Sequence, residues 1–456
     1  MFVNREKELS LLESEYTSKE FSFSVIYGRR RVGKTTLLKE FIKDKPAIYF
    51  LVTLESENIV LDRFKEIVAD FFNDDFLKDL SLKDFQSLFK YIANRDFNKK
   101  LIIIIDEFQY LAKINRSIPS IFQYIVDELL ANKNIHLVLC GSIISMMYAQ
   151  TLSYSSPLYG RRTSSMKLEA LEFEYLKEFF PNRDQNELIE IFAVLGGVPK
   201  YLKMFKDSND IFESIKKNIL TKNSFLFDEP RYILQNEVNE PITYFTILEI
   251  IASGEHKIGN IASKLGKNVQ NITSFISKLI ELDIIYKEVP VTEDEYKSKK
   301  GLYFIKDNFF RFWFMYVLRY QSQLEMENIE YVLEKVRLNF SSFVSKTYED
   351  LCIKWTAKNF NTLKYGRWWD KNDEIDVVGI LEDGVVVGEC KWSNKKVGVD
   401  ILETLQSKAK KLKLPVKRYI LFAKSGFTDE LLKREDVLLV EGVNRVLVDS
   451  YVRKFC

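Results

Sequence analysis

A glycine-rich loop between an apolar strand and a helix constrains this chain more than any other feature. The run FSVIY at 23–27 is followed by Gly28, Gly33, Lys34 and Thr35 in the spacing GxxxxGKT, and TLLKEFIK then continues as a helix. Glycines at these positions let backbone N–H groups turn inward around an anion, and the amino end of the helix adds positive potential. The pattern therefore predicts a phosphate-binding loop behind the first strand of a parallel sheet.

The positions of this loop have distinct expected tasks. Lys34 would reach the β- and γ-phosphate oxygens of ATP, and the hydroxyl of Thr35 would bind Mg²⁺. The arginines at 29–31 have two interpretations, as phosphate contacts or as solvated loop charges. The residues expected to contact the nucleotide here are Gly28, Arg29, Arg30, Arg31, Val32, Gly33, Lys34, Thr35 and Thr36.

Two further strands end in polar residues. The apolar run LIIII at 101–105 is followed by Asp106 and Glu107, and a strand at 135–140 is followed by Gly141 and Ser142. In parallel sheets ligands bind at the carboxyl ends of the strands. We expect Asp106 to hold Mg²⁺, Glu107 to orient or deprotonate the attacking water, and Ser142 to sense the γ-phosphate. Taken alone, the acidic pair also fits a solvated strand end, and Ser142 fits a turn that caps a helix.

The middle of the chain shows a pattern of three helices and a hairpin. It extends from 242 to 305, and the third helix places Ile272, Phe275, Ile276 and Leu279 on one face. This order indicates a winged helix. Its third helix carries Lys267, Asn268, Gln270, Asn271 and Ser274 and its wing carries Lys297, Lys299 and Lys300, residue types that contact DNA. Winged helices also bind proteins, and acidic residues at 293–295 dilute the charge of the wing, so both kinds of partner stay open.

The last hundred residues return to an alternation of strands and helices. Asp376 follows Glu374 and Ile375 on one strand, and Glu389-Cys390-Lys391 lies on the next. On neighbouring strands Asp376 and Glu389 can share a divalent metal, and Lys391 lies on the same strand face as Glu389 because side chains alternate. This resembles the PD-(D/E)XK nuclease superfamily, although the proline of its name is absent.

Further residues of this region match the nuclease pattern. Glu349 lies on the preceding helix, and Gln406 and Lys410 lie on the following one. Between Lys391 and Arg418 there are nine basic and two acidic residues, a local excess that fits a phosphate backbone. The same excess also fits a solvated lysine-rich helix face. A nuclease fold retained for DNA binding without cleavage is a further alternative.

Several segments together resemble the archaeal-type ATPase family, which is related to AAA+ and STAND P-loop NTPases. They are FVNREKEL at 2–9, YGRRRVGKTTLL at 27–38, IIIIDEFQYL at 102–111, CGSIISMM at 140–147, SPLYGRRT at 156–163, GGVPKYL at 196–202 and DNFFRFWF at 307–314. The resemblance implies that Val3, Asn4 and Arg5 lie near the adenine and that Pro199 packs on the base. It also implies that Arg161 or Arg162 acts as an arginine sensor or finger, whereas by themselves these two residues are a basic loop.

The predicted fold class is α/β, with a P-loop NTPase parallel sheet, a helical lid, a winged-helix domain and a C-terminal α/β restriction-endonuclease-like domain. The predicted domains are a P-loop ATPase core at 1–175, a lid at 176–235, a winged helix at 236–306, an aromatic helical connector at 307–335 and a nuclease-like domain at 336–456. A length of 456 residues is ample for several cores.

Composition and charge bound the possible partners. The 67 basic and 65 acidic residues leave a net charge of +2, so any nucleic-acid surface must be local. Four scattered cysteines and two histidines offer no zinc spacing and indicate a reducing, cytoplasmic setting. No apolar run is long enough to predict a membrane span, and the charged start does not resemble a signal peptide.

The sequence therefore predicts an ATPase that requires Mg²⁺ and couples its nucleotide state to DNA engagement. It also predicts a DNA cleavage site at Asp376, Glu389 and Lys391 that uses a second Mg²⁺ or Mn²⁺. The alternative is a regulatory switch that acts through protein contacts and carries a silent nuclease-like domain. Assembly into a homo-oligomer would follow if a neighbouring copy supplied the arginine finger.

Overall fold

The computed structural model describes residues 3–208, 210–443 and 445–446. Its chain divides into two compact units. The first comprises the residues up to Tyr175 together with Val198–Lys200 and Ile233–Asn239. The second comprises Leu176–Gly197, Tyr201–Tyr232 and the residues from Glu240 onward.

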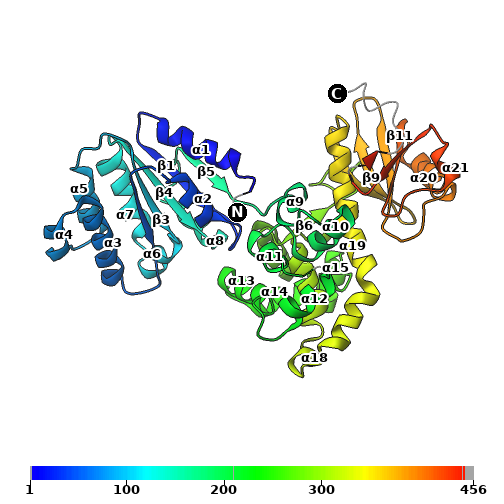
Figure 1. Cartoon of the computed structure of the whole chain (residues 1–456), viewed down its shortest axis with the longest axis horizontal. Helices are drawn as coiled ribbons and strands as arrows, with labels where there is room; N and C mark the ends of the chain where they lie inside the picture. Colours follow the sequence, from blue (N-terminus) through cyan, green and yellow to red (C-terminus); the bar gives the residue numbers. More distant parts are fainter. Residues whose placement is uncertain (1–2, 209, 444, 447–456) are drawn as a thin grey trace. The chain divides into compact units, whose positions relative to one another are not determined.

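A five-stranded parallel sheet forms the centre of the first unit (Figure 1). Its order is β2-β3-β4-β1-β5, so that β1 lies between two strands that follow it much later in the chain. The strands are β1 (Ser22–Tyr27), β2 (Ala47–Leu51), β3 (Leu101–Asp106), β4 (Ile135–Gly141) and β5 (Ser164–Lys167). The predicted parallel α/β sheet of a P-loop protein is confirmed.

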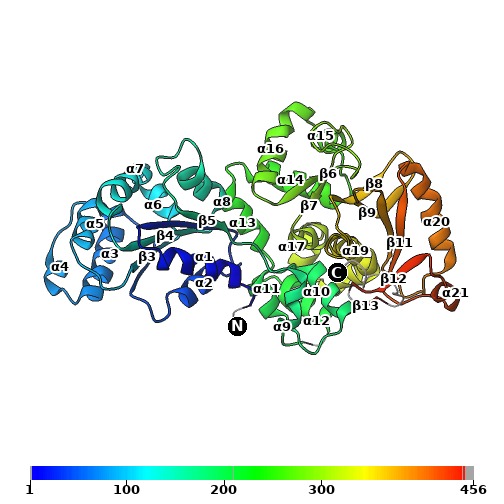
Figure 2. The same cartoon turned by 90° about the horizontal axis from the view of Figure 1, so that it is seen from above.

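Helices cover both faces of this sheet (Figure 2). Leu12 of α1 and Leu37, Leu38 and Phe41 of α2 pack with the even-numbered isoleucines of β3 on one face. Side chains of α3, α5 and α7 pack with the odd-numbered isoleucines on the other. The bounds are α1 (Glu6–Thr17), α2 (Lys34–Phe41), α3 (Glu57–Phe72), α4 (Asp75–Asp79), α5 (Phe85–Ala93), α6 (Gln109–Ile114), α7 (Ile118–Tyr124) and α8 (Ile144–Met147). Burial on both faces explains why these strands read as continuous apolar runs.

Short helices follow the first sheet in the chain. They are α9 (Leu176–Phe179), α10 (Gln185–Leu195), α11 (Pro199–Met204), α12 (Ile211–Ile215) and α13 (Glu229–Glu237). The Asp184 side chain and Glu187 form a capping box at the start of α10. Gly196, with φ of +62°, ends that helix, and Pro199 begins α11.

Residues 241–305, which we call the helix–hairpin segment, belong to the second unit. It contains α14 (Pro241–Ala252), α15 (Ile258–Lys264) and α16 (Val269–Glu281), followed by the antiparallel pair β6 (Ile285–Glu288) and β7 (Leu302–Ile305). The elements occur in the order that the sequence predicts. Their identity as a winged helix stays a prediction.

A 31-residue helix runs through the second unit (Figure 1). It is α19 (Ile329–Asn359), and it follows α17 (Asn308–Phe312) and α18 (Gln321–Glu325). The domain boundary predicted between 335 and 336 falls inside this continuous helix and is therefore not a structural break. No glycine or proline occurs between 329 and 359, so nothing in the local sequence interrupts the helix.

The C-terminal part of the second unit is a six-stranded mixed sheet in the order β13-β12-β11-β10-β9-β8. The pairs β8–β9 and β9–β10 are antiparallel, and β10–β11 and β11–β12 are parallel. The elements are β8 (Lys364–Trp369), β9 (Glu374–Ile380), β10 (Val385–Lys391), α20 (Val399–Ala409), β11 (Val416–Ala423), α21 (Asp429–Leu432), β12 (Val437–Glu441) and β13 (Arg445–Val446). The sheet brings the predicted carboxylates onto adjacent strands.

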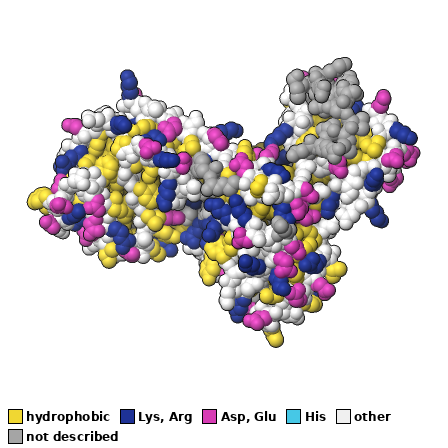
Figure 3. Space-filling view, in the orientation of Figure 1, with side chains coloured by type: hydrophobic (Ala, Val, Ile, Leu, Met, Phe, Trp, Pro, Cys, Tyr) yellow, Lys and Arg dark blue, Asp and Glu magenta, His cyan; other side chains and the backbone are white. Residues whose placement is uncertain are grey.

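The surface of each unit mixes charges of both signs (Figure 3). Basic and acidic side chains both occur on the face shown, in keeping with a net charge of +2. Within the described part of the chain, no helix combines the length and hydropathy that crossing a membrane requires.

Candidate nucleotide site and carboxylate site

The phosphate loop joins the carboxyl end of β1 to the amino end of α2. Gly28 has φ of +152°, and a Cβ built there would lie 2.3 Å from the carbonyl oxygen of Leu168. Gly33 precedes α2 in the left-handed region, with φ of +103°. Both positions thus need glycine, the first for space and the second for its backbone conformation.

Lys34 points into this loop. Its Nζ donates hydrogen bonds to the carbonyl oxygens of Gly28 at 2.7 Å and Arg29 at 2.9 Å. The side chain is buried, and this burial lowers the pKa of Lys34, while nearby Glu107 and Asp106 act in the opposite direction. The ammonium group is therefore held inside the loop, and its contact with nucleotide phosphates stays a prediction.

Thr35 and Asp106 form the pair expected to bind magnesium. Thr35 Oγ1 donates to Oδ2 of Asp106 at 3.1 Å, and Asp106 is buried. Tyr49 of β2 also donates its hydroxyl to this oxygen at 2.5 Å. A hydroxyl and a carboxylate side by side are oxygen ligands that suit Mg²⁺, so the residues fit the ion. The sequence analysis did not predict Tyr49. The residue could have been found only by knowing that β2 pairs with β3, which places Tyr49 near Asp106.

Glu107 is bound by two neighbouring donors. Ser142 Oγ donates to Oε2 of Glu107 at 2.7 Å, and the amide of Gln109 donates to the same oxygen. Gln109 is fully buried, and its Nε2 lies 3.5 Å from Ser142 Oγ. Glu107 itself has φ of +59°, a left-handed conformation that is costly for a residue other than glycine and often marks functional sites. Gln109 was not predicted, and only its polarity within the run FQYL distinguishes it in the sequence.

Arg5 supports the phosphate loop from the amino-terminal segment. Its Nη2 donates to the carbonyl oxygens of Val32 at 3.1 Å and Glu169 at 2.7 Å. Val3 is buried, and Asn4 adopts φ of +47°. Arg5 thus contacts the backbone of the phosphate loop. Its role near the adenine, which the resemblance implies, stays a prediction.

The remaining predicted nucleotide residues differ in their surroundings. Arg30 donates to the hydroxyl of Tyr110 at 2.9 Å. Thr36 is exposed in the first turn of α2. Pro199 is half-buried at the start of α11, within a segment that groups with the first unit. The nucleotide contacts of these residues stay predictions.

Arg161 lies near the end of the first sheet where its strands begin, opposite to the phosphate loop. Thr163, two residues later, donates its N–H to Phe23 O near the beginning of β1, whereas the phosphate loop follows the end of that strand. Arg161 Nε is 2.8 and 2.9 Å from the two oxygens of Asp127. The placement therefore does not bring Arg161 to the phosphate loop of its own chain. Arg162 is half-buried, and its Nη1 has no hydrogen-bond partner among the residues that the structure describes.

The second predicted site lies on β9 and β10 of the C-terminal sheet. Asp376 accepts a hydrogen bond from the N–H of Cys390 at 2.9 Å, and Lys391 Nζ donates to Oε1 of Glu389 at 2.9 Å. The structure brings Asp376, Glu389 and Lys391 together as neighbours. Burial, followed by the charges of Glu389 and Glu349, raises the pKa of Asp376 to about 7.

Lys408 of α20 is a further member of this site. Its Nζ lies 3.3 Å from both carboxylate oxygens of Glu389. Sequence reasoning named Gln406 and Lys410 instead, but Gln406 contacts Asp436 at 3.4 Å and Lys410 is exposed. The rotation of α20 about its own axis determines which of its side chains faces Glu389, and the sequence does not specify that rotation.

The carboxylate site fits a divalent cation through two ligands. Asp376 and the buried Glu389 repel each other, and a bound cation would relieve this repulsion. The third acidic residue of the prediction, Glu349, accepts hydrogen bonds from Arg367. Within the described residues no group of three or more His, Cys, Asp or Glu side chains is arranged to hold a metal.

Comparisons with known proteins identify an ATPase domain in the first half of the chain. A family model described as an ATPase domain predominantly from Archaea matches residues 2–205. A second model, for archaeal and bacterial proteins of unknown function, matches residues 313–408.

Relatives extend this similarity over most of the chain. An uncharacterized protein of Methanocaldococcus jannaschii is 37% identical over 405 residues, which cover 87% of this chain and 88% of the relative. An uncharacterized ATP-binding protein of Pyrococcus abyssi is 25% identical over 279 residues, 51% of this chain and 82% of the relative. A solved Walker-type ATPase of Pyrococcus abyssi covers 70% of this chain and 96% of its own, with 22% identity and a TM-score of 0.49.

Proposed function

Because the chain belongs to the family of the ATPase domain predominantly from Archaea, we propose that it binds ATP with Mg²⁺, hydrolyses it, and uses its nucleotide state to control how its C-terminal domain engages DNA. The observation that carries the first part is the cluster at the carboxyl ends of β1, β3 and β4. There Thr35 contacts Asp106, and Ser142 contacts Glu107.

Each residue of this cluster has a chemical task in hydrolysis. Lys34 neutralises charge on the β- and γ-phosphates, and Mg²⁺ at Thr35 and Asp106 would stabilise the charge that develops as the bond between the β and γ groups breaks. Glu107 accepts a proton from the water whose oxygen attacks the γ-phosphorus. ADP leaves with the bridging oxygen, and inorganic phosphate is the second product.

Ser142 and Gln109 relate the state of Glu107 to the presence of the γ-phosphate. In the structure both donate to Oε2 of Glu107 and hold its carboxylate in place. A γ-phosphate beside Ser142 would compete for the hydroxyl and release one of these two bonds, so that the carboxylate could turn toward the attacking water. ATP itself would thus free the base.

Metal-dependent DNA cleavage is proposed for the second site. Asp376 and Glu389 would hold Mg²⁺ or Mn²⁺, and Lys391, 2.9 Å from Glu389, would position the attacking water or the scissile phosphate. The lysine-rich stretch from 391 to 418 supplies positive charge for the DNA backbone.

A regulatory switch that acts through protein contacts is the second candidate. Lys391 and Lys408 both pair with Glu389, so this carboxylate is already compensated without a metal. In the predicted wing, Lys300 pairs with Glu293 and the side chain of Lys364 reaches the Glu293 carbonyl. The pairs at Glu389 occupy groups that the proposed cleavage site would use, and the pair at Lys300 occupies one of the lysines that would contact DNA from the wing.

One experiment separates the two candidates. Purified protein is incubated with plasmid DNA and Mn²⁺, with and without ATP, beside the Asp376→Asn variant, while ATP turnover is followed in parallel. Multiple ATP turnovers accelerated by DNA, with nicking that the variant lacks, support the proposal. A single turnover that DNA does not stimulate, with equal nicking by both proteins, supports the switch.

A further inference from the structure

A cavity in the second unit is lined by elements that lie far apart in the chain. Its volume is about 240 Å³, roughly the liquid volume of eight water molecules. The end of α14 with the turn after it, β6, β7 and α17 form one part of its wall, and α19 forms another. Of the described residues that line it, none belongs to the nucleotide site or to the carboxylate site. The cavity is thus distinct from both.

Arg311 of α17 brings a guanidinium group to this cavity. Its Nη2 donates to the carbonyl oxygen of Phe343 at 3.1 Å and to Oγ1 of Thr347 at 2.8 Å, two uncharged oxygens. Its Nε is buried and has no hydrogen-bond partner among the residues that the structure describes. Because a guanidinium forms its strongest hydrogen bonds with negatively charged oxygens, an anion in the cavity would be a better partner than those it has.

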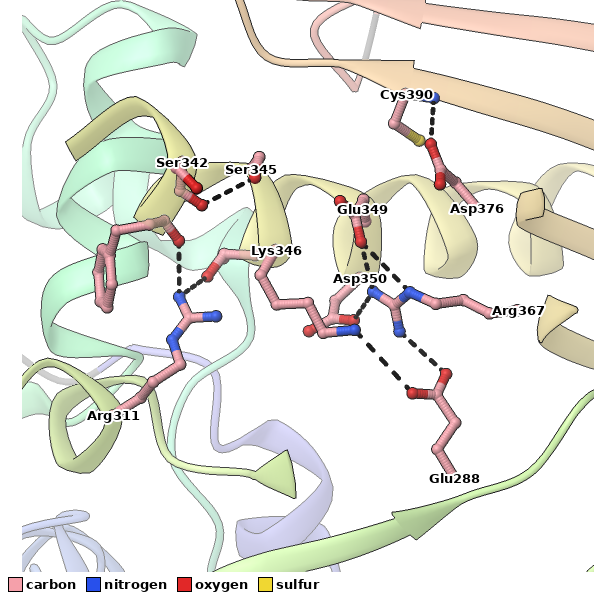
Figure 4. Close-up of polar contacts among 12 residues, drawn as sticks. Glu288, Arg311, Ser342, Ser345, Lys346, Glu349, Asp350, Arg367, Asp376 and Cys390 are labelled. Atoms are coloured by element: carbon pink, nitrogen blue, oxygen red, sulfur yellow. Dashed lines mark hydrogen bonds and ion pairs between the residues drawn. The ribbon is translucent and has the colours of Figure 1, made fainter. Parts of the chain in front are cut away.

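Lys346 of α19 adds a second positive charge. Its Nζ lies 4.3 Å from the ring centre of Phe304 and 4.0 Å from Oε2 of Glu288. Figure 4 shows Lys346 and Arg311 on the same side of α19. Burial lowers the pKa of both side chains, because it removes water that would stabilise their charges. A negative group in the cavity would compensate for that loss.

The charges of the lining favour an anion with a single charge. Asp350 also faces the cavity, but its Oδ1 accepts a hydrogen bond from Arg367 at 2.6 Å. His256 is uncharged at neutral pH, since burial lowers its pKa. Arg311 and Lys346 against Asp350 leave a net charge of +1 on the lining. A carboxylate balances this charge, whereas a phosphate monoester, with a charge of about −2, exceeds it.

The rest of the lining is mainly apolar. Phe304, Phe343 and Ile251 contribute two aromatic rings and an aliphatic side chain. The ring of Phe304 lies 4.2 Å from that of His256, whose Nδ1 is held by the carbonyl oxygen of Tyr303 at 3.0 Å. Apolar walls with a few polar groups are typical of small-molecule sites, so a ligand that fills this one carries an apolar body beside its charged group.

We propose that this cavity binds a small organic anion, a carboxylate with an apolar body that Arg311 contacts, and that the bound anion fastens the helix–hairpin segment to α19. His256 and Phe304 come from the segment and Lys346 comes from α19, so one ligand touches both. A ligand that binds only their packed arrangement stabilises that arrangement. Neither nucleotide nor divalent metal is needed for this binding.

Titration calorimetry on the full chain, without nucleotide or divalent metal, compares three probes. Benzoate has the proposed charge and an apolar ring, benzyl alcohol has the ring without the charge, and inorganic phosphate has charge without the ring. Benzoate should bind, and the other two should bind at least about 10-fold more weakly. If benzoate does not bind, or if either of the others binds as tightly, the proposed ligand is wrong.

Variants locate the bound benzoate. Arg311→Gln should weaken binding by about 10- to 100-fold, because it removes a charge-assisted hydrogen bond. Lys346→Gln should weaken it in the same direction. Arg319→Gln, an exposed arginine that follows α17 and does not line the cavity, is the matched control and should bind as the wild type does. Circular dichroism checks that Arg311→Gln is folded, and if it is not, Lys346→Gln decides. Unchanged affinity in the folded variants would place benzoate outside this cavity.

Hydrogen exchange tests the effect on the helix–hairpin segment. The amide of Tyr303 in β7 donates to the carbonyl oxygen of His256 at 2.8 Å, so it reports on the wall that the segment supplies. Benzoate should slow exchange in residues 302–305 of the wild type and leave it unchanged in Lys346→Gln at a concentration that saturates only the wild type. Equal exchange with and without benzoate, in a wild type that binds it, would overturn the fastening of the segment.

Discussion

The hydroxyl of Ser142 lies 2.7 Å from Oε2 of Glu107, although 35 residues separate them in the sequence. The parallel sheet produces this contact, because Glu107 follows β3, Ser142 follows β4, and these strands are neighbours. Gln109 joins the same carboxylate from the first residue of α6. The general base of the proposed reaction is therefore held by two donors before any nucleotide is bound.

Lys34→Ala should abolish ATP binding. The substitution removes the ammonium group that the loop directs toward the phosphates through the carbonyls of Gly28 and Arg29. Fluorescence titration with a labelled ATP measures the affinity. Lys39→Ala, an exposed lysine of the same helix, should bind as the wild type does, and unchanged affinity in Lys34→Ala would contradict the site.

Glu107→Gln should retain ATP and lose turnover. The amide keeps the size of the side chain and cannot take the proton of the attacking water, so we expect kcat to fall by about 10²- to 10⁴-fold. Steady-state phosphate release gives kcat, and the titration above gives the affinity. A variant that hydrolyses ATP at the wild-type rate would show that another group serves as the base.

Gly28→Ala should destabilise the first unit and weaken nucleotide binding. Its Cβ would meet the Leu168 carbonyl oxygen at 2.3 Å, and the loop would have to move to avoid it. Gly259→Ala is the opposite case, because nothing lies within 4 Å of the added carbon in α15. That change should raise stability by about 0.5–1 kcal/mol. Urea denaturation compares the two, and equal behaviour would argue against the close contact at Gly28.

Asp376→Ala, Glu389→Ala and Lys391→Ala should each remove Mn²⁺- or Mg²⁺-dependent DNA cleavage. Two of these residues are the proposed ligands, and the third lies 2.9 Å from Glu389. Plasmid nicking followed on agarose gels is the measurement. Lys433→Ala, which changes an exposed lysine that follows α21 and lies outside the lysine-rich stretch, should cleave normally. If the three site variants nick DNA as well as the control variant does, the nicking must come from a contaminant or from another site.

The raised pKa of Asp376 also predicts that the stability of the protein depends on pH in the absence of divalent metal. Burial and the charges of Glu389 and Glu349 raise its pKa from 3.8 to about 7. Between these values the folded state binds more protons at this group than the unfolded state, so Asp376 lowers stability progressively as the pH rises from about 4 to 7 and by a constant amount above 7.

Asp376→Asn removes this penalty because the amide does not ionise. The variant should therefore be more stable than the wild type at pH 8, by at most a few kcal/mol, and should lose this advantage at pH 4. Urea denaturation in EDTA at both pH values measures the difference. An advantage that is independent of pH would show that Asp376 titrates normally.

Part of the nucleotide site follows from local sequence alone. The spacing from Gly28 to Thr35 requires the loop, and apolar strands ahead of Asp106 and Ser142 place both at the same edge of a parallel sheet. The structure confirms this edge. It also shows Arg161 beside Asp127 near the start of β1, away from the loop, a placement that a basic motif cannot reveal.

The sequence by itself determined where the central strands β1, β3 and β4 lie, because a strand buried on both faces must be apolar throughout and polar residues then mark its end. Only the tertiary structure decided which polar groups meet. Tyr49 reaches Asp106, Lys408 reaches Glu389, and Arg367 joins Glu288 to Glu349. These contacts depend on the order of strands in a sheet and on the rotation of a helix against it, which are set by packing between segments far apart in the chain and leave no local pattern.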